Sequence, residues 1–179
     1  MNKHRNAVIG VVISGALILA SGAFAKKRQS ASRLTMDRDF AALAAQVNLS
    51  EIRMADLAMT KTSNPQVKNM AQRLEADHMK ANDRLKEIAA KQNLTLPAKL
   101  DAKNQAAYDR LSKLSGAEFD KAYVREEAKD HKSAIAEFRR EASHGTNPEL
   151  KKYASETLPE LEHHLQLAEA TEPSARREK

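Results

Sequence analysis

The sequence predicts an all-α protein whose main domain is an antiparallel four-helix bundle. Two observations lead to this expectation. Aromatic residues make up only 4% of the 179-residue chain, glycine and proline number five each, and cysteine is absent. This composition favours long helices and disfavours sandwiches and barrels. Long stretches of the chain also repeat apolar side chains at spacings of three and four, which is the period of a helix with one buried face.

Four such stretches form the expected bundle, over residues 37–60, 65–93, 116–144 and 148–170. Asn64-Pro65 and Asn147-Pro148 each combine a capping side chain with a first-turn proline, and so predict two helix starts. Ser115-Gly116-Ala117-Glu118 fits a capping box that opens the third stretch. Residues 94–116 form a long connection, with a short extra helix expected at about 102–114.

The loop lengths predict how the helices are joined. Short turns at Asn64 and Asn147 connect the first to the second stretch and the third to the fourth, which gives two helical hairpins. One long connection joins the hairpins, as in ferritin-like bundles. The segments that begin at Asn64-Pro65 and Asn147-Pro148 also resemble each other, which is a weak internal repeat.

Residues 1–25 have the pattern of a signal peptide. Lys3, His4 and Arg5 precede an almost wholly apolar run, and Ala23-Phe24-Ala25 supplies the small-x-small step that signal peptidase requires. The alternative is an uncleaved anchor, because the apolar run is borderline in length for a bilayer. The basic Lys26-Lys27-Arg28 that follows favours cleavage. We therefore expect a periplasmic or secreted protein with no transmembrane span in its mature form.

The net charge of +6 lies mainly at the two ends of the chain. Residues 26–36 are expected to form a basic, disordered leader, residues 37–170 the bundle, and residues 171–179 a flexible tail. The bundle itself is close to neutral and lacks a basic face with stacking aromatics, so nucleic acid is not an expected partner. The leader either solubilises the chain or attracts it weakly to an anionic envelope surface.

Each long stretch carries one metal-capable side chain at a core position. These four candidate metal ligands are Glu51, His78, His131 and His164. Glu51 and His78 lie almost equally far from Asn64 along the chain, and the other two lie almost equally far from Asn147. At the rise of an α-helix, both pairs are level and roughly 20–24 Å from their turns. Because buried polar groups need partners, we expect the four to converge in the middle of the bundle.

Four further side chains are secondary candidates: Glu75, Glu127, Glu160 and His163. Two Glu-x-x-His pairs plus a glutamate on each of the other helices is the pattern that holds two irons or manganeses in a bundle core. His163 and His164 point about 100° apart, so only one can be central, and the apolar register prefers His164. Asp77 and Asp130 are expected to hydrogen-bond to the candidate ligands.

Nitrogen and oxygen ligands suit iron, manganese or zinc better than calcium. The alternative is a buried polar network that only fixes helix register, in which each imidazole is satisfied by a carboxylate. Absence of cysteine excludes disulfides and thiolate metal sites. The chain has no nucleotide-binding loop and no nucleophile-base set, so the sequence predicts no particular enzymatic reaction.

Several short motifs together resemble one protein family. They are Asn64-Pro65, Asp77-His78, Leu96-Pro97, Ser115-Gly116-Ala117-Glu118-Phe119-Asp120, Asp130-His131 and Leu158-Pro159-x-Leu161-x-x-His164-Leu165. Over about residues 37–170 the chain resembles the exported bacterial domain-of-unknown-function family 4142. The resemblance implies a ferritin-like four-helix fold, export and the matching set Glu51, His78, His131 and His164. It implies no proven activity, and the spacing of Glu127 and His131 differs from that of ferritin itself.

Two classes of function follow from these observations. In the first, the exported bundle binds a transition metal and takes part in metal or oxidative stress handling in the cell envelope. In the second, it is a non-catalytic structural or partner-binding protein whose core Glu/His network only stabilises the bundle.

Overall fold

The computed structural model describes the backbone of residues 18–175 and the side chains of residues 35–172. The secondary structure of these residues is helical, without strands. The helices are α1 (Ile18–Lys61), α2 (Pro65–Gln92), α3 (Ala102–Ser112), α4 (Gly116–His144) and α5 (Pro148–Ala175). The predicted all-α class is therefore confirmed. None of the described helices is both long and apolar enough to cross a membrane.

The chain divides into two compact units. Met1–Ser32 form the first unit, whose described part is the beginning of α1. Arg33–Lys179 form the second, which holds the rest of α1 and the other four helices. Most of the predicted signal peptide, residues 1–17, lies outside the described residues, so its cleavage stays a prediction.

Two helix starts follow the predicted capping chemistry. The Asn64 side chain accepts hydrogen bonds from the backbone of Gln66 and Val67, and Asn147 does the same for Glu149 and Leu150. These four bonds satisfy backbone donors that a helix leaves free at its first turn. The expected capping box at Ser115 was wrong, because its side chain makes no capping bond. The following Gly116 has φ +54°, so the chain enters α4 through a left-handed turn that glycine tolerates.

The first and last helices extend beyond the predicted ends of the bundle at residues 37 and 170. α1 is already helical through residues 26–36, where a disordered leader was expected. Those residues contain no proline or glycine, and an apolar stripe shows where a helix is buried rather than where it begins. α5 likewise continues to Ala175, through the start of the expected flexible tail. Thr171 is still buried, so packing supports the final turns.

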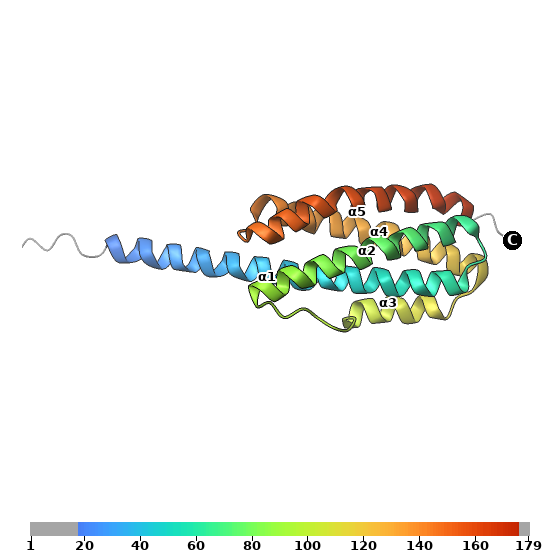
Figure 1. Cartoon of the computed structure of the whole chain (residues 1–179), viewed down its shortest axis with the longest axis horizontal. Coiled ribbons are helices and arrows are strands. Elements are labelled where there is room, and N and C mark those ends of the chain that lie inside the picture. The colour runs from blue at the N-terminus through green and yellow to red at the C-terminus, as the bar shows by residue number, and fades with distance from the viewer. Residues whose placement is uncertain (1–17, 176–179) are drawn as a thin grey trace, which may run out of the picture. The chain divides into compact units, whose positions relative to one another are not determined.

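Apolar side chains of the second unit form two separate clusters. The first apolar cluster consists of Met54, Ala55, Leu57, Ala58, Val67, Met70, Ala71, Leu74, Ala107, Leu111, Phe119, Tyr123, Val124 and Ala168. The second apolar cluster consists of Phe40, Ala41, Ala44, Ala45, Ala81, Leu85, Ile88, Ala134, Ile135, Phe138, Leu150, Tyr153, Ala154 and Leu161. All four long helices contribute to both, and α3 contributes to the first. Figure 1 shows α4 and α5 side by side, with α2 also against α5.

A band of buried polar side chains lies between the two clusters. On each long helix, this band interrupts the apolar stripe at the point where the stripe passes from one cluster to the other. We call it the polar layer, and its members are Asn48, Glu51, His78, Glu127, His131 and His164. The fold thus brings these side chains from four helices to one level of the core.

Candidate metal centre

Three histidines from three helices meet in the polar layer. His78 of α2, His131 of α4 and His164 of α5 are at most 2% exposed. One ring nitrogen from each lies within 4.8 Å of the other two. The predicted convergence of these three side chains is therefore what the structure shows.

A carboxylate orients the ring of His164. Its Nε2 lies 3.0 Å from Oδ2 of Asp77, which also pairs with Arg73. Burial opposes ionisation of Asp77, but the hydrogen bonds from His164 and Arg73 outweigh it and lower its pKa. An ionised carboxylate only accepts hydrogen bonds, so Nε2 of His164 carries the proton and Nδ1 has a free lone pair.

The other two imidazoles are oriented by neutral oxygens. His131 Nδ1 lies 2.9 Å from the backbone oxygen of Glu127, and His78 Nδ1 lies 3.1 Å from Oδ1 of Asn48. Asn48 is held in turn by donating its amide to the hydroxyl of Tyr153 at 3.1 Å. Carbonyl oxygens accept, so both histidines carry a proton on Nδ1, and in the neutral ring Nε2 then holds the lone pair.

The ring nitrogens of the three histidines lie close together. Nε2 of His131 and Nδ1 of His164 lie 3.3 Å apart, and with these tautomers neither carries a proton for the other. Nε2 of His78 has no hydrogen-bond partner among the described residues. Two nitrogens bound to one tetrahedral zinc at about 2.0–2.1 Å are themselves about 3.3 Å apart. The spacing of the His131 and His164 nitrogens therefore fits a shared cation.

Burial favours the neutral form of His78 and His164. It lowers the pKa of His78 to about 3, although the nearby Glu51 carboxylate opposes the shift. Burial also lowers the pKa of His164, against the opposing influence of Asp77. Metal ligation requires neutral imidazole, so this electrostatic environment suits a ligand set.

Two glutamates adjoin His131 on its other side. Glu51, Glu127 and His131 form a second group whose ligand atoms lie within 4.8 Å of one another. Nδ1 of His131 is 4.0 Å from Oε1 of Glu51 and 3.7 Å from Oε2 of Glu127. Because that nitrogen already donates to a backbone carbonyl, the second group offers a metal its carboxylates rather than this imidazole.

The two carboxyl groups differ in charge. Burial raises the pKa of Glu127 well above its ordinary value, and the negative charge of Glu51 raises it further. Burial also opposes ionisation of Glu51, but His131 and its other polar neighbours outweigh it and lower its pKa. The pair therefore holds one proton on Glu127 and one negative charge on Glu51, beside the imidazole of His131.

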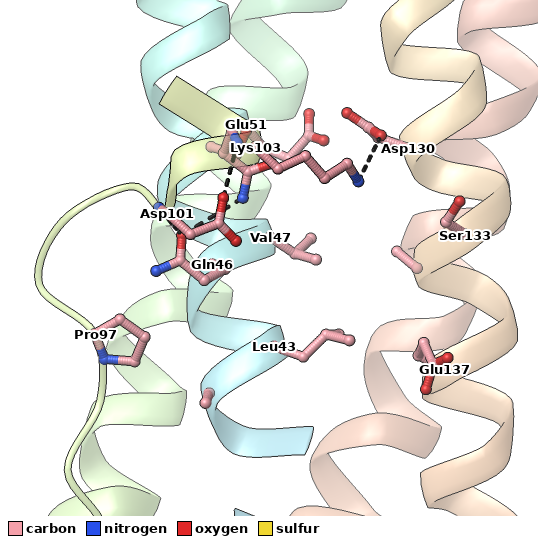
Figure 2. Close-up of a pocket in the computed structure, with 14 residues that line it drawn as sticks. Leu43, Gln46, Val47, Glu51, Pro97, Asp101, Lys103, Asp130, Ser133 and Glu137 are labelled. Atoms are coloured by element: carbon pink, nitrogen blue, oxygen red, sulfur yellow. Dashed lines mark hydrogen bonds and ion pairs between the residues drawn. The ribbon is translucent and has the colours of Figure 1, made fainter. Parts of the chain in front are cut away.

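A cavity of about 360 Å³ reaches the polar layer at Glu51. It lies between α1, the connection from α2 to α3, α3 itself and α4 (Figure 2). Gln46 of α1 forms one wall and ties the connection to α1, since it donates to the Lys99 carbonyl and accepts from the Asp101 backbone. Asp130 and Ser133 of α4 form the opposite wall.

Comparison with known families identifies the chain. Residues 23–171 match the family model described as Domain of unknown function (DUF4142). The chain belongs to the DUF4142 family. Among solved structures, it is similar to a DUF305 fragment from Deinococcus radiodurans, with a TM-score of 0.70 and 12% identity. That similarity covers 78% of this chain and 96% of the fragment, and at this identity it concerns the fold alone. No curated protein matches the chain.

Several predicted residues of this DUF4142 chain lie outside both groups. Glu75 and Glu160 are only partly buried, and His163 is exposed. A residue one position from the buried stripe points about 100° away from it, which removes these three from the core. Asp130, expected beside a histidine, instead lines the cavity and faces Lys103. The two Glu-x-x-His pairs therefore do not build the two-metal arrangement of ferritin-like bundles.

The sequence analysis of the DUF4142 chain missed two residues of the histidine site. Asn48 and Tyr153 hold His78 in place, although neither was a candidate. The periodicity contained a signal for Asn48, because it lies four residues after Ala44 and three before Glu51 on the buried stripe. Nothing in the sequence indicates that Tyr153 reaches Asn48.

Proposed function

We propose that this protein is an exported helical bundle that binds a transition-metal ion through His78, His131 and His164. The proposal is carried by one observation: three buried histidines place one ring nitrogen each within 4.8 Å of the other two. The tautomers that their hydrogen-bond acceptors favour leave a lone pair on each ring. Lone pairs confined at this distance repel each other unless a cation lies between them. A network serving stability alone would place a donor opposite each acceptor.

The ligand chemistry points to a borderline divalent ion. Three neutral imidazoles suit zinc or iron(II), and weaker-binding manganese follows them in the usual order of affinity. Three histidines with one position left for another ligand is also the arrangement of catalytic zinc sites. The negative charge on Glu51 lies next to the imidazoles and favours a cation over a neutral guest.

The order of residues in the apolar clusters supports a ferritin-like bundle. The beginnings of α2 and α4 share the first apolar cluster, and their later parts share the second. α1 and α5 contribute in the reverse order, so they run opposite to α2 and α4. The second hairpin therefore begins in the first apolar cluster, whereas the first hairpin ends in the second. The chain has to run back along the bundle between them, and residues 93–115, which include α3, make this connection.

We further propose that the metal is bound outside the cytoplasm. The basic start, the apolar run and the Ala23-Phe24-Ala25 step support export through a cleaved signal. Binding of zinc, iron or manganese in the envelope suits metal or oxidative stress handling. Intact-mass measurement on protein from its native compartment tests the expected mature start at Lys26.

The decisive experiment compares the loss of a buried histidine of the centre with the loss of an exposed histidine outside it. His78→Ala removes a ring of the centre, whereas His163→Ala removes an exposed imidazole that adjoins His164 in the chain. We expect the parent and His163→Ala to bind one zinc or iron(II) ion by equilibrium dialysis and calorimetry. His78→Ala should lose this binding, with affinity at least tenfold weaker, while circular dichroism remains helical.

Two results would instead support the alternative, in which the core Glu/His network only stabilises the bundle. In one, the parent binds none of zinc, iron(II) or manganese under anaerobic conditions. In the other, His78→Ala and the parent bind metal equally, while the variant is less stable by about 1–3 kcal/mol because partners of the ring are left unsatisfied.

A further inference from the structure

The cavity beside α1 and α4 ends on polar atoms that the protein itself does not satisfy. Ser50 and Glu51 line it and are 4% and 3% exposed. The Oγ of Ser50 and Oε2 of Glu51 have no hydrogen-bond partner among the described residues. An unsatisfied hydroxyl and an unsatisfied carboxylate oxygen are costly to bury, so they indicate a place where solvent or a ligand arrives.

The walls of this cavity carry more negative than positive charge. Four carboxylates line it, from Glu51, Asp101, Asp130 and Glu137, against the single ammonium of Lys103. Such a lining concentrates cations and repels anions, since low-dielectric walls focus the field of the charges that line them.

One ion pair spans the cavity. Lys103 reaches from α3 to Asp130 of α4, with Nζ 3.8 Å from Oδ1 (Figure 2). The Lys103 side chain is 70% exposed, whereas that of Asp130 is 17% exposed. A long, exposed lysine at this distance is held weakly, so a divalent cation can take its place beside the aspartate.

We propose that this cavity is the access route by which a divalent cation reaches the centre, with Asp130 as its first contact. Lys103 is the counter-ion that the arriving cation displaces, and Glu51 lies at the inner end, between the cavity and the imidazoles. The inference rests on the proposed metal centre, but it concerns the rate of metal uptake and not the affinity.

The test uses charge-neutralising variants of this ion pair in the full chain. Stopped-flow uptake of zinc should be about tenfold slower in Asp130→Asn than in the parent, and several-fold faster in Lys103→Gln. Both variants should bind zinc with the stoichiometry of the parent, and their dissociation constants should lie within about threefold of the parent value. Raising the ionic strength should reduce the difference. The matched control is the Asp83–Lys86 pair, 3.0 Å apart and away from the cavity. Asp83→Asn and Lys86→Gln should leave the rate unchanged.

A second measurement separates this inference from the proposed centre. In His78→Ala, which lacks a centre residue, Mn²⁺ should still broaden the amide resonances of Asp130, Ser133 and Ser50 first. Asp130→Asn combined with His78→Ala should lose that broadening. Absence of this selective broadening, or equal uptake rates in all ion-pair variants, overturns the access route. Broadening at the cavity in a parent chain that binds no metal tightly supports the route and contradicts the centre instead.

Discussion

At the residue scale, the direction of each imidazole is set by the oxygen that accepts its N–H. These oxygens differ in kind: an amide on α1, a backbone carbonyl on α4 and a carboxylate on α2. Asp77 adjoins His78 in the chain but bonds His164 on another helix, because the two neighbours point to different sides of α2. The ring directions of His78 and His164 therefore result from contacts between helices, whereas that of His131 is set within α4.

Two tyrosines of the core offer a matched test of this hydrogen bonding. Tyr153→Phe removes the acceptor of Asn48 and should lower the free energy of unfolding by about 1–3 kcal/mol. It should also weaken metal binding, since Asn48 orients His78. The buried hydroxyl of Tyr123 has no hydrogen-bond partner among the described residues, so Tyr123→Phe should leave stability unchanged or higher. Urea unfolding of both variants measures these free energies. Equal losses of stability in the two variants would contradict the prediction.

At the element scale, a polar contact joins Asp37 of α1 to Thr146 in the turn between α4 and α5. The Asp37 carboxylate accepts from the backbone N–H of Thr146 at 2.8 Å and from its hydroxyl. Glu141, one turn earlier on α4, is 1% exposed and lies near that carboxylate. Its carboxyl also occupies the space that a side chain at residue 145 would need, which explains the glycine there.

Glu141 makes stability depend on pH in a definite direction. Burial, followed by the charge of Asp37, raises its pKa to about 7 from an ordinary value of 4.5. The folded chain therefore holds a proton that the unfolded chain releases above pH 4.5. The resulting stability is fully present below pH 4.5 and is lost as the pH rises through 7, at up to about 1.4 kcal/mol per pH unit.

Glu141→Gln should remove this contribution. Denaturant unfolding between pH 4.5 and 7.5 should show a smaller decline of stability with rising pH in Glu141→Gln than in the parent. Glu87→Gln, on the exposed face of α2, is the control and should behave as the parent does. Parallel pH profiles for the parent and Glu141→Gln would contradict the assignment.

At the scale of the whole molecule, the polar layer divides one core into two apolar clusters. Burying imidazoles and carboxyl groups there costs free energy that a continuous apolar core would not lose. The metal ion that we propose at the three imidazoles would offset part of this cost, because it would bind the folded chain and not the unfolded one. Because the polar layer lies between two apolar clusters, packing on both sides holds its side chains in place.

Thermal unfolding should therefore depend on metal. At a free zinc concentration about one hundred times the dissociation constant, the stabilisation is about 2.7 kcal/mol, which raises the melting temperature by roughly 5–10 °C. A chelator should reverse the shift, and His78→Ala should not show it. Calorimetry of the parent with and without zinc checks this, and an equal shift in the variant would place the bound metal elsewhere.

Local chemistry predicted much of the fold because it acts within a few residues of chain. Asn64-Pro65 and Asn147-Pro148 begin helices wherever they occur, and both do so here. Helix periodicity places a residue on a buried face, and it correctly brought His78, His131 and His164 into the core. It also placed Glu51 there, although in a group with Glu127 rather than with all three histidines.

The sequence by itself determined the helical class, two of the helix caps and the burial of Glu51, His78, His131 and His164, because each depends on residues close by in the chain. Only the tertiary structure decided which nitrogen of His78 and His164 is free, that Asn48 and Tyr153 hold His78, and that a cavity opens beside Glu51. These features depend on side-chain directions on different helices and on the course of the long connection. Such directions are set by packing between distant segments, which no local pattern of residues records.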